Sequence, residues 1–300
     1  MTEEAMPQRR DEPVEHQPDR QVAEEPIGLI AGRGEFPLEF CRQARRNQVP
    51  AIAAVAMYGE TSAEIERLAH SVDWAYPGQL RRAIKCLKRR GVKNVVFAGQ
   101  IKPARLFRGL RPDLKALKLL WRIRERNADT IFSAAANEFE KSGIHVLPSI
   151  TFMDEALADG GLMGRVRPNP AVLRDIEYGT RIAREVSRLN IGQTVVVKRG
   201  TILAVEGFEG TDKTIRRGGE LGRGKVTVVK VAKPNHDLRF DVPCIGMRTV
   251  ESLKMADARA LAVQAGMSLF LRREDVLNAC DAAGIVVYGI DIPYAPADDG

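Results

Sequence analysis

The sequence has few cysteines and no long apolar run. Its four cysteines lie far apart and form no C-x-x-C pair, which argues against a zinc ribbon and against a disulfide framework. No apolar stretch approaches the ~18–20 residues of a membrane-spanning helix. The opening residues also lack the apolar core of a secretory signal. We therefore expect a protein of a reducing, cytoplasmic compartment.

Several signatures of catalysis and nucleic-acid binding are missing. The sequence has no G-x-S-x-G, H-E-x-x-H or Walker A motif, so serine hydrolases, zincins and P-loop enzymes lack support. Aromatic residues make up 6% of the chain and do not alternate with the basic residues. This composition argues against a nucleic-acid-binding surface, and we expect no nucleic-acid partner.

Charge is distributed unevenly along the chain. Residues 1–25 carry eight acids and three bases, a net charge of −5, so the remainder carries +7 minus −5, or +12. A basic body predicts an anionic partner, such as a phosphorylated metabolite or an acidic membrane surface. The acidic stretch is poor in apolar residues and is predicted to be a disordered tail.

The length of 300 residues predicts two domains. Apolar strands and helices alternate over residues 26–150, which predicts a Rossmann-like parallel sheet. Residues 151–170 are rich in Gly and Pro and are interpreted as a linker. Residues 171–292 mix strands and helices without clean alternation, with a helix expected over 249–266, so we predict a C-terminal catalytic α+β domain. The fold class is therefore α/β with a second α+β domain, followed by a tail over 293–300.

The segment AGRGEFP places a G-x-G turn between a predicted strand and a predicted helix. Such a turn lets backbone N–H groups and a helix N-terminus meet a phosphate. It departs from the dinucleotide fingerprint because Pro37 stands where a third glycine is expected, and no acid ends the second strand. A nucleotide or sugar phosphate is thus favoured over NAD. The alternative is a tight turn that needs glycine for steric reasons only.

The Gly-rich segment EGFEGTDKTIRRGG contains the acids Glu206, Glu209 and Asp212. Asp212 is explained equally by helix capping. The functional alternative makes Glu209 or Asp212 a ligand of a hard cation such as Mg²⁺. In that case Arg216 and Arg217 would bind phosphate.

The segment KPNHDLRFDVP alternates charged and apolar residues. Alternate residues of a strand face opposite ways and recur roughly every 6.5–7 Å, so the pattern predicts a strand with a charged face of Asp237, Arg239 and Asp241. Its apolar face would consist of Leu238, Phe240 and Val242. Two carboxylates around a guanidinium suit a metal and a phosphate, although an exposed strand of mixed charge is the simpler alternative.

Residues 98–127 carry nine bases against two acids, with apolar residues at helical spacing. A basic amphipathic helix over about 113–126 would suit an anionic membrane surface or the acyl chains of a lipid. The alternative is a helix that docks by its apolar side and leaves a solvated basic face.

Five segments, in order from about Ile27 to Ile290, resemble the LpxI family of UDP-2,3-diacylglucosamine pyrophosphatases. They are IAGRGEFP, FAGQIKP, GQTVVVKRGTILAVEGFEGTD, KVAKPNHDLRFDVPCIGMRTVE and AGIVVYGI. The resemblance implies a cytoplasmic enzyme of lipid A biosynthesis in a Gram-negative bacterium, peripheral to the inner membrane. It would use Mg²⁺ (or Mn²⁺) and hydrolyse a UDP-linked glycolipid, UDP-2,3-diacylglucosamine, to lipid X and UMP by water attack on the α-phosphate. We also expect a homodimer.

The resemblance implies catalytic acids at Asp241 and Asp212, with Glu209 as a third metal ligand. Expected substrate contacts are Gly32, Gly34, Gln100, Lys102, Thr211, Lys233, Asp237 and Arg239. The segment ERNADTIF departs from the family pattern, because only Asp129 keeps the acidic character expected there, and we leave this helix out of the predicted site. A non-catalytic lipid- or nucleotide-binding protein is the alternative, and turnover distinguishes the two.

Overall fold

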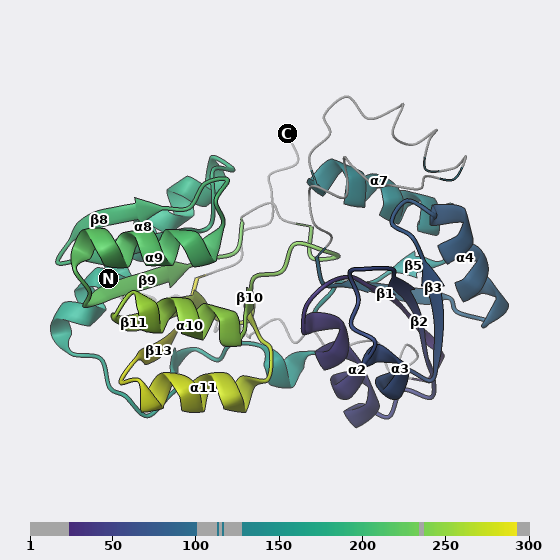
Figure 1. The fold of residues 1–300 in the computed structure, drawn as a ribbon, viewed down its shortest axis with the longest axis horizontal. Coiled ribbons are helices and arrows are strands. Elements are labelled where there is room, and N and C mark those ends of the chain that lie inside the picture. The colour runs from purple at the N-terminus through teal and green to yellow at the C-terminus, as the bar shows by residue number, and fades with distance from the viewer. Residues whose placement is uncertain (1–23, 101–112, 114–115, 117–127, 234–236, 293–300) are drawn as a thin grey trace, which may run out of the picture.

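The computed structural model describes residues 24–100, 113, 116, 128–233 and 237–292. Lys102, the C-terminal tail and almost all of the predicted acidic tail and basic helix lie outside the described residues. The chain forms two lobes, shown in Figure 1, with the N-terminal lobe in purple to teal at the right and the C-terminal lobe in green to yellow at the left. Within the described residues, no helix has the length and apolarity needed to cross a membrane.

The N-terminal lobe is built on a parallel five-stranded sheet of order β3-β2-β1-β4-β5. Its strands are β1 (Ile27–Ala31), β2 (Ile52–Met57), β3 (Ser71–Ala75), β4 (Asn94–Ala98) and β5 (His145–Val146). Its helices are α2 (Phe36–Arg46), α3 (Ile65–Leu68), α4 (Leu80–Arg89) and α7 (Ala128–Glu140). One apolar cluster joins the sheet to α2 and α3, and a second joins its other face to α4 and α7. Burial on both faces explains the continuous apolar strands of the sequence.

The order of this sheet creates a topological switch point. The chain passes from β1 outward to β2 and β3, and then returns to place β4 on the other side of β1. Loops that follow strands on either side of such a reversal leave the sheet in opposite directions, and ligands of open α/β sheets bind there. Here the loops in question follow β1 and β4.

The C-terminal lobe is built on a mixed six-stranded sheet of order β6-β13-β11-β9-β7-β8. Strands β9, β11 and β13 are parallel, whereas β6 and β7 run antiparallel to their neighbours. Its strands are β6 (Gly161–Leu162), β7 (Thr194–Lys198), β8 (Thr201–Val205), β9 (Val226–Lys230), β11 (Ala258–Gln264) and β13 (Val286–Ile290). Its helices are α8 (Pro170–Arg188), α9 (Thr211–Gly222), α10 (Met247–Met255) and α11 (Arg273–Ala282). The predicted fold class, a parallel-sheet domain followed by a mixed one, is confirmed.

The helix expected over 249–266 is wrong in its second half, because α10 ends at Met255 and the chain then forms strand β11. The segment ARALAVQ is rich in alanine, which favours helix. The segment forms a strand because it pairs with β9 on one side and β13 on the other. The periodicity of a short apolar run cannot distinguish a buried strand from a buried helix. The order β9-α10-β11-α11-β13 therefore does alternate.

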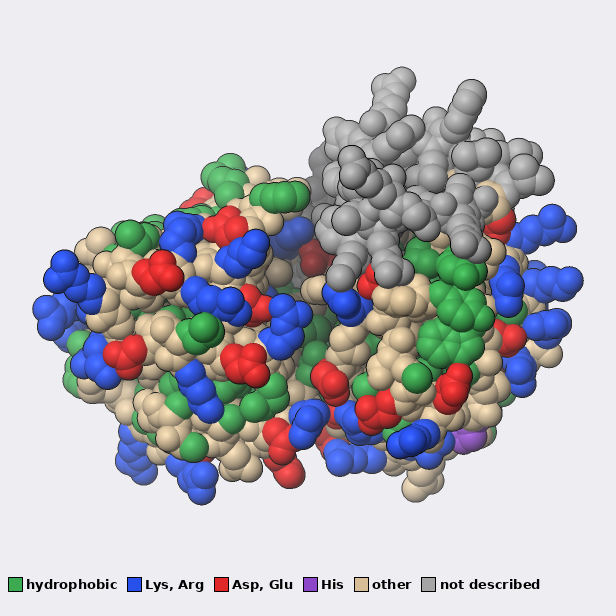
Figure 2. Space-filling view, viewed as in Figure 1, with side chains coloured by type: hydrophobic (Ala, Val, Ile, Leu, Met, Phe, Trp, Pro, Cys, Tyr) green, Lys and Arg blue, Asp and Glu red, His purple; other side chains and the backbone are tan. Residues whose placement is uncertain are grey.

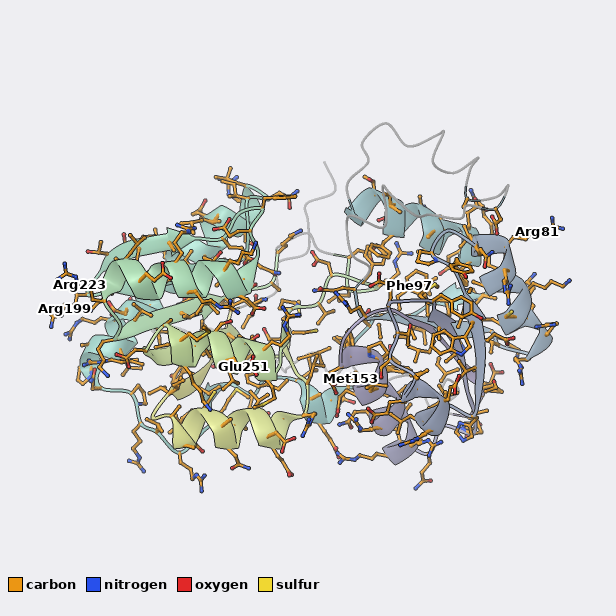
Figure 3. All side chains as sticks on the ribbon, in the orientation of Figure 1. Arg81, Phe97, Met153, Arg199, Arg223 and Glu251 are labelled. Atoms are coloured by element: carbon orange, nitrogen blue, oxygen red, sulfur yellow. The ribbon has the colours of Figure 1, made fainter. Side chains whose placement is uncertain are left out.

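The two lobes share part of one apolar cluster. Phe152 and Met153, from the segment predicted as a linker, belong to the same apolar cluster as Leu269 and Leu271 of the C-terminal lobe. Leu269 lies in a short parallel strand pair, β10 (Cys244–Ile245) with β12 (Leu269–Phe270). A 3-10 helix, η1 (Asp154–Ala156), comes directly after Met153 in the chain. Met153 lies where the lobes meet in Figure 3. The predicted domain boundaries stay a prediction.

The sheet of the C-terminal lobe has an outer and an inner edge. Arg199, in the turn between β7 and β8, and Arg223, just before β9, lie at the outer end of the lobe in Figure 3. The carboxyl ends of β8 and β9 therefore lie on the side that faces the N-terminal lobe.

Candidate functional site

The loops after β1 and β4 are held together by their backbones. The N–H of Arg33 donates to the carbonyl of Gln100 (2.7 Å), and the N–H of Gln100 donates to the carbonyl of Arg33 (3.1 Å). A Cβ on Gly32 would lie 2.8 Å from the carbonyl oxygen of Gln100, so only glycine allows this approach. The switch point thus brings Gly32 and Gln100 together.

Gly34 has a different reason to be glycine. Its φ is +96°, and a Cβ there would meet nothing within 4 Å, so the requirement is conformational and the space beside it is open. Helix α2 begins two residues later. The structure therefore gathers Gly32, Gly34 and Gln100 at one sheet edge, and their role as substrate contacts stays a prediction.

The strand predicted over residues 237–242 is wrong. The N–H groups of Phe240 and Asp241 both donate to the carbonyl of Asp237 at 3.0 Å, which closes a single helical turn. The Asp237 carboxylate also accepts from the N–H of Arg239 (3.1 Å), a local bond that competes with strand formation. Asp237, Arg239 and Asp241 consequently do not share a face at strand spacing.

This turn, hereafter the Asp241 turn (residues 237–242), docks on the N-terminal lobe. The N–H of the buried Ser149 donates to the carbonyl of Leu238 (2.7 Å), and its Oγ lies 2.6 Å from the carbonyl of Arg239 and 2.7 Å from that of Phe97. The Phe240 ring stacks on Phe132 of α7 with 5.9 Å between centroids. The Asp241 turn is thus fixed at the carboxyl end of β4.

The charged side chains of the Asp241 turn form ion pairs. Lys233 Nζ lies 3.2 Å from Asp241 Oδ2, and Arg239 binds Asp237 through two nitrogens, with distances down to 2.6 Å. The hydrogen bond to Asp237 raises the pKa of Arg239. Nearby, burial raises the pKa of the Cys244 thiol to about 12, while Lys230 lowers it and Asp241 raises it. Both of these charges therefore act on Cys244.

The Gly-rich segment after β8 opens helix α9 at Thr211. Asp212, in its first turn, pairs with the exposed Arg248 at 3.2 Å. Glu209 accepts from Arg217 at 2.5 Å, and this bond lowers the pKa of Glu209 to about 2. Arg216 donates to Ser252. Arg216 and Arg217, the two arginines expected to bind phosphate, therefore both have partners within the protein.

A buried polar chain leads from α9 into the sheet. Thr211 Oγ1 donates to Glu206 Oε1 (2.9 Å) and accepts from Lys230 Nζ (3.0 Å). Lys230 ends β9 and is 6% exposed, and Glu206 is 8% exposed. Lys230 is not among the residues predicted for the site. The available signal was a lysine within the otherwise apolar strand of KVTVVKVA.

The three predicted metal ligands are carboxylates, the type that Mg²⁺ prefers, but three is more than Mg²⁺ usually takes from a protein. Carboxylates suit Mg²⁺, which usually takes one or two of them together with substrate phosphate oxygens. Among the residues that the structure describes, no three Asp, Glu, His or Cys side chains are grouped as a metal cluster. Glu209 lines a pocket with residues of α9, including Lys213 and Glu220. Asp241 and Asp212 supply carboxylates of the right type, and their role as metal ligands stays a prediction.

Comparisons with known proteins agree along almost the whole chain. The LpxI N-terminal domain model matches residues 26–156, and the LpxI C-terminal domain model matches residues 159–288. The UDP-2,3-diacylglucosamine pyrophosphatase LpxI of Caulobacter vibrioides is 32% identical over 290 residues, which cover 90% of this chain and 99% of that protein.

Two solved structures match at a distance. A CobK precorrin-6A reductase matches with a TM-score of 0.29 and 15% identity, over 92% of this chain and 91% of that one. The biotin carboxylase domain of Hydrogenobacter thermophilus 2-oxoglutarate carboxylase matches with a TM-score of 0.24 and 14% identity, over 65% of this chain and 41% of that one. On the strength of both domain models and the Caulobacter relative, this chain belongs to the LpxI family.

Proposed function

We propose that this protein hydrolyses UDP-2,3-diacylglucosamine to lipid X and UMP in lipid A biosynthesis. The observation that carries the proposal is the meeting of three of the family-specific segments at one place. The Asp241 turn, from the C-terminal lobe, docks beside β4 of the N-terminal lobe, and the loop after β4 is bonded to the Gly32–Gly34 turn. A relative at 32% identity that is named for this activity supports it.

In this mechanism Asp241 orients a water molecule toward the α-phosphorus and accepts its proton. A bond forms between the water oxygen and the α-phosphorus, and the bond from that phosphorus to the bridging oxygen breaks. The bridging oxygen leaves with lipid X, and the water oxygen stays on UMP. Lys233, already 3.2 Å from Asp241, stabilises negative charge as it develops.

The carboxylates of Asp241 and Asp212 would hold Mg²⁺ (or Mn²⁺), which supplies positive charge against the diphosphate when bound. Thr211 and Arg239 contribute hydrogen bonds on the side of the C-terminal lobe. On the side of the N-terminal lobe, the N–H groups of Gly32 and Gln100 already donate to the carbonyls of Ala98 and Arg33, so these residues would shape the wall of the site, and Gly34 leaves open space for the substrate. Glu209 is held by Arg217, and it would have to leave this partner in order to bind a metal.

The substrate's two acyl chains imply work at a membrane surface. We propose a cytoplasmic protein that contacts the inner membrane peripherally, because a body with net charge +12 outside the acidic tail (+7 minus −5) attracts anionic lipid. A homodimer is proposed as well. Figure 2 shows lysine and arginine side chains spread over both lobes on one face, with acids among them.

The test is turnover. The purified chain is incubated with detergent-dispersed UDP-2,3-diacylglucosamine, with Mg²⁺ or with EDTA, and UMP and lipid X are measured. We expect both products with Mg²⁺ and neither with EDTA. Binding of the substrate without any release of UMP would instead support a non-catalytic lipid- or nucleotide-binding protein.

A further inference from the structure

The cations predicted for the site already have acidic partners. Lys233 lies 3.2 Å from Asp241, and Arg239 binds both carboxylate oxygens of Asp237. An ion pair of this kind leaves little net charge to attract a doubly charged diphosphate. A cation without an acidic partner would add the most to the positive charge that the protein itself brings to the diphosphate.

Lys230 has no such acidic partner. Its side chain is buried, its Nζ donates to the neutral hydroxyl of Thr211, and no carboxylate of the described residues forms an ion pair with it. Burying an ammonium group without a counter-ion costs several kcal/mol. The acid that comes closest in the hydrogen-bonded chain is Glu206, whose link to Lys230 runs through the Thr211 hydroxyl.

The position of Lys230 suits an anion that lies between the two lobes. It is the last residue of β9, at the sheet edge that faces the N-terminal lobe, and it meets the first residue of α9. Three residues after Lys230, Lys233 forms its ion pair with Asp241, which places the end of β9 in the neighbourhood of the Asp241 turn. A charge with little water around it acts over several ångströms.

We propose that Lys230 supplies the positive charge that binds the diphosphate of a nucleoside diphosphate sugar at this site. Thr211 and Glu206 position it: the Thr211 hydroxyl donates its hydrogen bond to the Glu206 carboxylate, which leaves the hydroxyl oxygen free to accept from Lys230. This inference rests on the proposed function for the identity of the diphosphate, and its test uses binding so that the two fail separately.

The experiment measures the affinity of the full chain for UDP by calorimetry, together with its melting temperature. Lys230→Met keeps the length of the side chain and removes the charge. We expect UDP affinity to fall ~10-fold or more, as expected for a lost charge-assisted contact, with a melting temperature no lower than that of the wild type. If Lys230 were purely structural, Lys230→Met would melt at a lower temperature and keep its affinity for UDP.

Lys198→Met is the matched control. Lys198 is also partly buried on the same sheet, but it lies beside Arg199 at the outer end, where it donates to the carbonyls of Gly222 and Gly224. We expect this variant to melt at a lower temperature and to keep its UDP affinity within about two-fold. Lys230→Arg should recover part of the affinity that Lys230→Met loses.

Unchanged UDP affinity in Lys230→Met overturns the inference, as does a wild type that does not bind UDP. If Lys230→Met does not fold, Lys230→Gln takes its place, because it retains a donor for Thr211, with the same expected loss. If the wild type turns over UDP-2,3-diacylglucosamine but UDP binding does not depend on Lys230, this inference fails and the proposed function stands. Lys230-dependent UDP binding without turnover removes the proposed function alone.

Discussion

The two sheet edges that form the candidate site differ in what they present. The edge of the N-terminal lobe presents mainly backbone: Gly32, Gly34 and Gln100, held by reciprocal bonds between two loops. The edge of the C-terminal lobe presents charged side chains in pairs, together with the buried cation Lys230. The difference suggests that the first lobe shapes the space and that the second lobe performs the chemistry.

The largest expected effect is on the charged edge. Asp241→Ala should lower kcat by about 10³-fold, because it removes the group that orients the attacking water. Thermal melting should stay close to that of the wild type, since the Asp241 side chain is only partly buried. Asp257→Asn is the control: Asp257 pairs with Lys225 at 3.0 Å on the surface. Near-native turnover in Asp241→Ala would exclude the catalytic role.

The backbone edge can be tested through its two glycines. Gly32→Ala puts a methyl group 2.8 Å from a backbone oxygen, so the two loops must separate, and we expect about 1–3 kcal/mol of lost stability together with lost activity. Gly34→Ala meets no atom and costs only the strain of φ +96°, about 1 kcal/mol. Urea unfolding measures both. Equal costs would mean that the close approach of the loops is unimportant.

The contact between the two edges depends on Ser149. Ser149→Ala removes the hydroxyl near the carbonyls of Phe97 and Arg239, and we expect a loss of about 1–2 kcal/mol and a several-fold lower kcat. Thr151→Ala is the control, because the Thr151 hydroxyl bonds only locally, to the carbonyl of Pro148. Wild-type kcat in Ser149→Ala would show that docking of the Asp241 turn does not depend on this bond.

The smallest effect concerns Cys244, beside the charged edge. Its pKa is raised by burial from 9.0 to about 12. A raised thiol pKa leaves less thiolate at a given pH, so alkylation by iodoacetamide at pH 8 should be about 1,000-fold slower than for a thiol of pKa 9. Mass spectrometry of the labelled peptide, in native buffer and in urea, measures this. Rapid native labelling would show that the edge is open to solvent at Cys244.

The sequence predicts the backbone edge better than the charged edge. Strand β1, the glycine turn and the start of α2 were predictable because they are local: an apolar run, glycines and a proline within a dozen residues. Neither the bonding of Arg33 to Gln100 nor the close approach of Gly32 was predictable, because both depend on the strand order.

For the charged edge, the sequence named the charged residues of segment 237–242 but predicted the wrong backbone conformation for them, a strand in place of a turn. Alternation over Asp237–Val242 suggested a strand, but the chain closes a turn on the carbonyl of Asp237, and Phe240 packs on the other lobe. Lys230 was not predicted as a site residue, because its burial without a counter-ion depends on the tertiary structure. Asp212 and Glu209 stay predicted metal ligands, and their ion pairs with Arg248 and Arg217 were not predicted, since Arg217 was expected to bind phosphate.

The most direct test of the account follows the oxygen of the attacking water. The full chain is incubated with UDP-2,3-diacylglucosamine and Mg²⁺ in water enriched in oxygen-18, and both products are analysed by mass spectrometry. Attack on the α-phosphorus predicts one heavy oxygen in UMP and none in lipid X. Label in lipid X, or no product at all from a folded protein, would contradict the account.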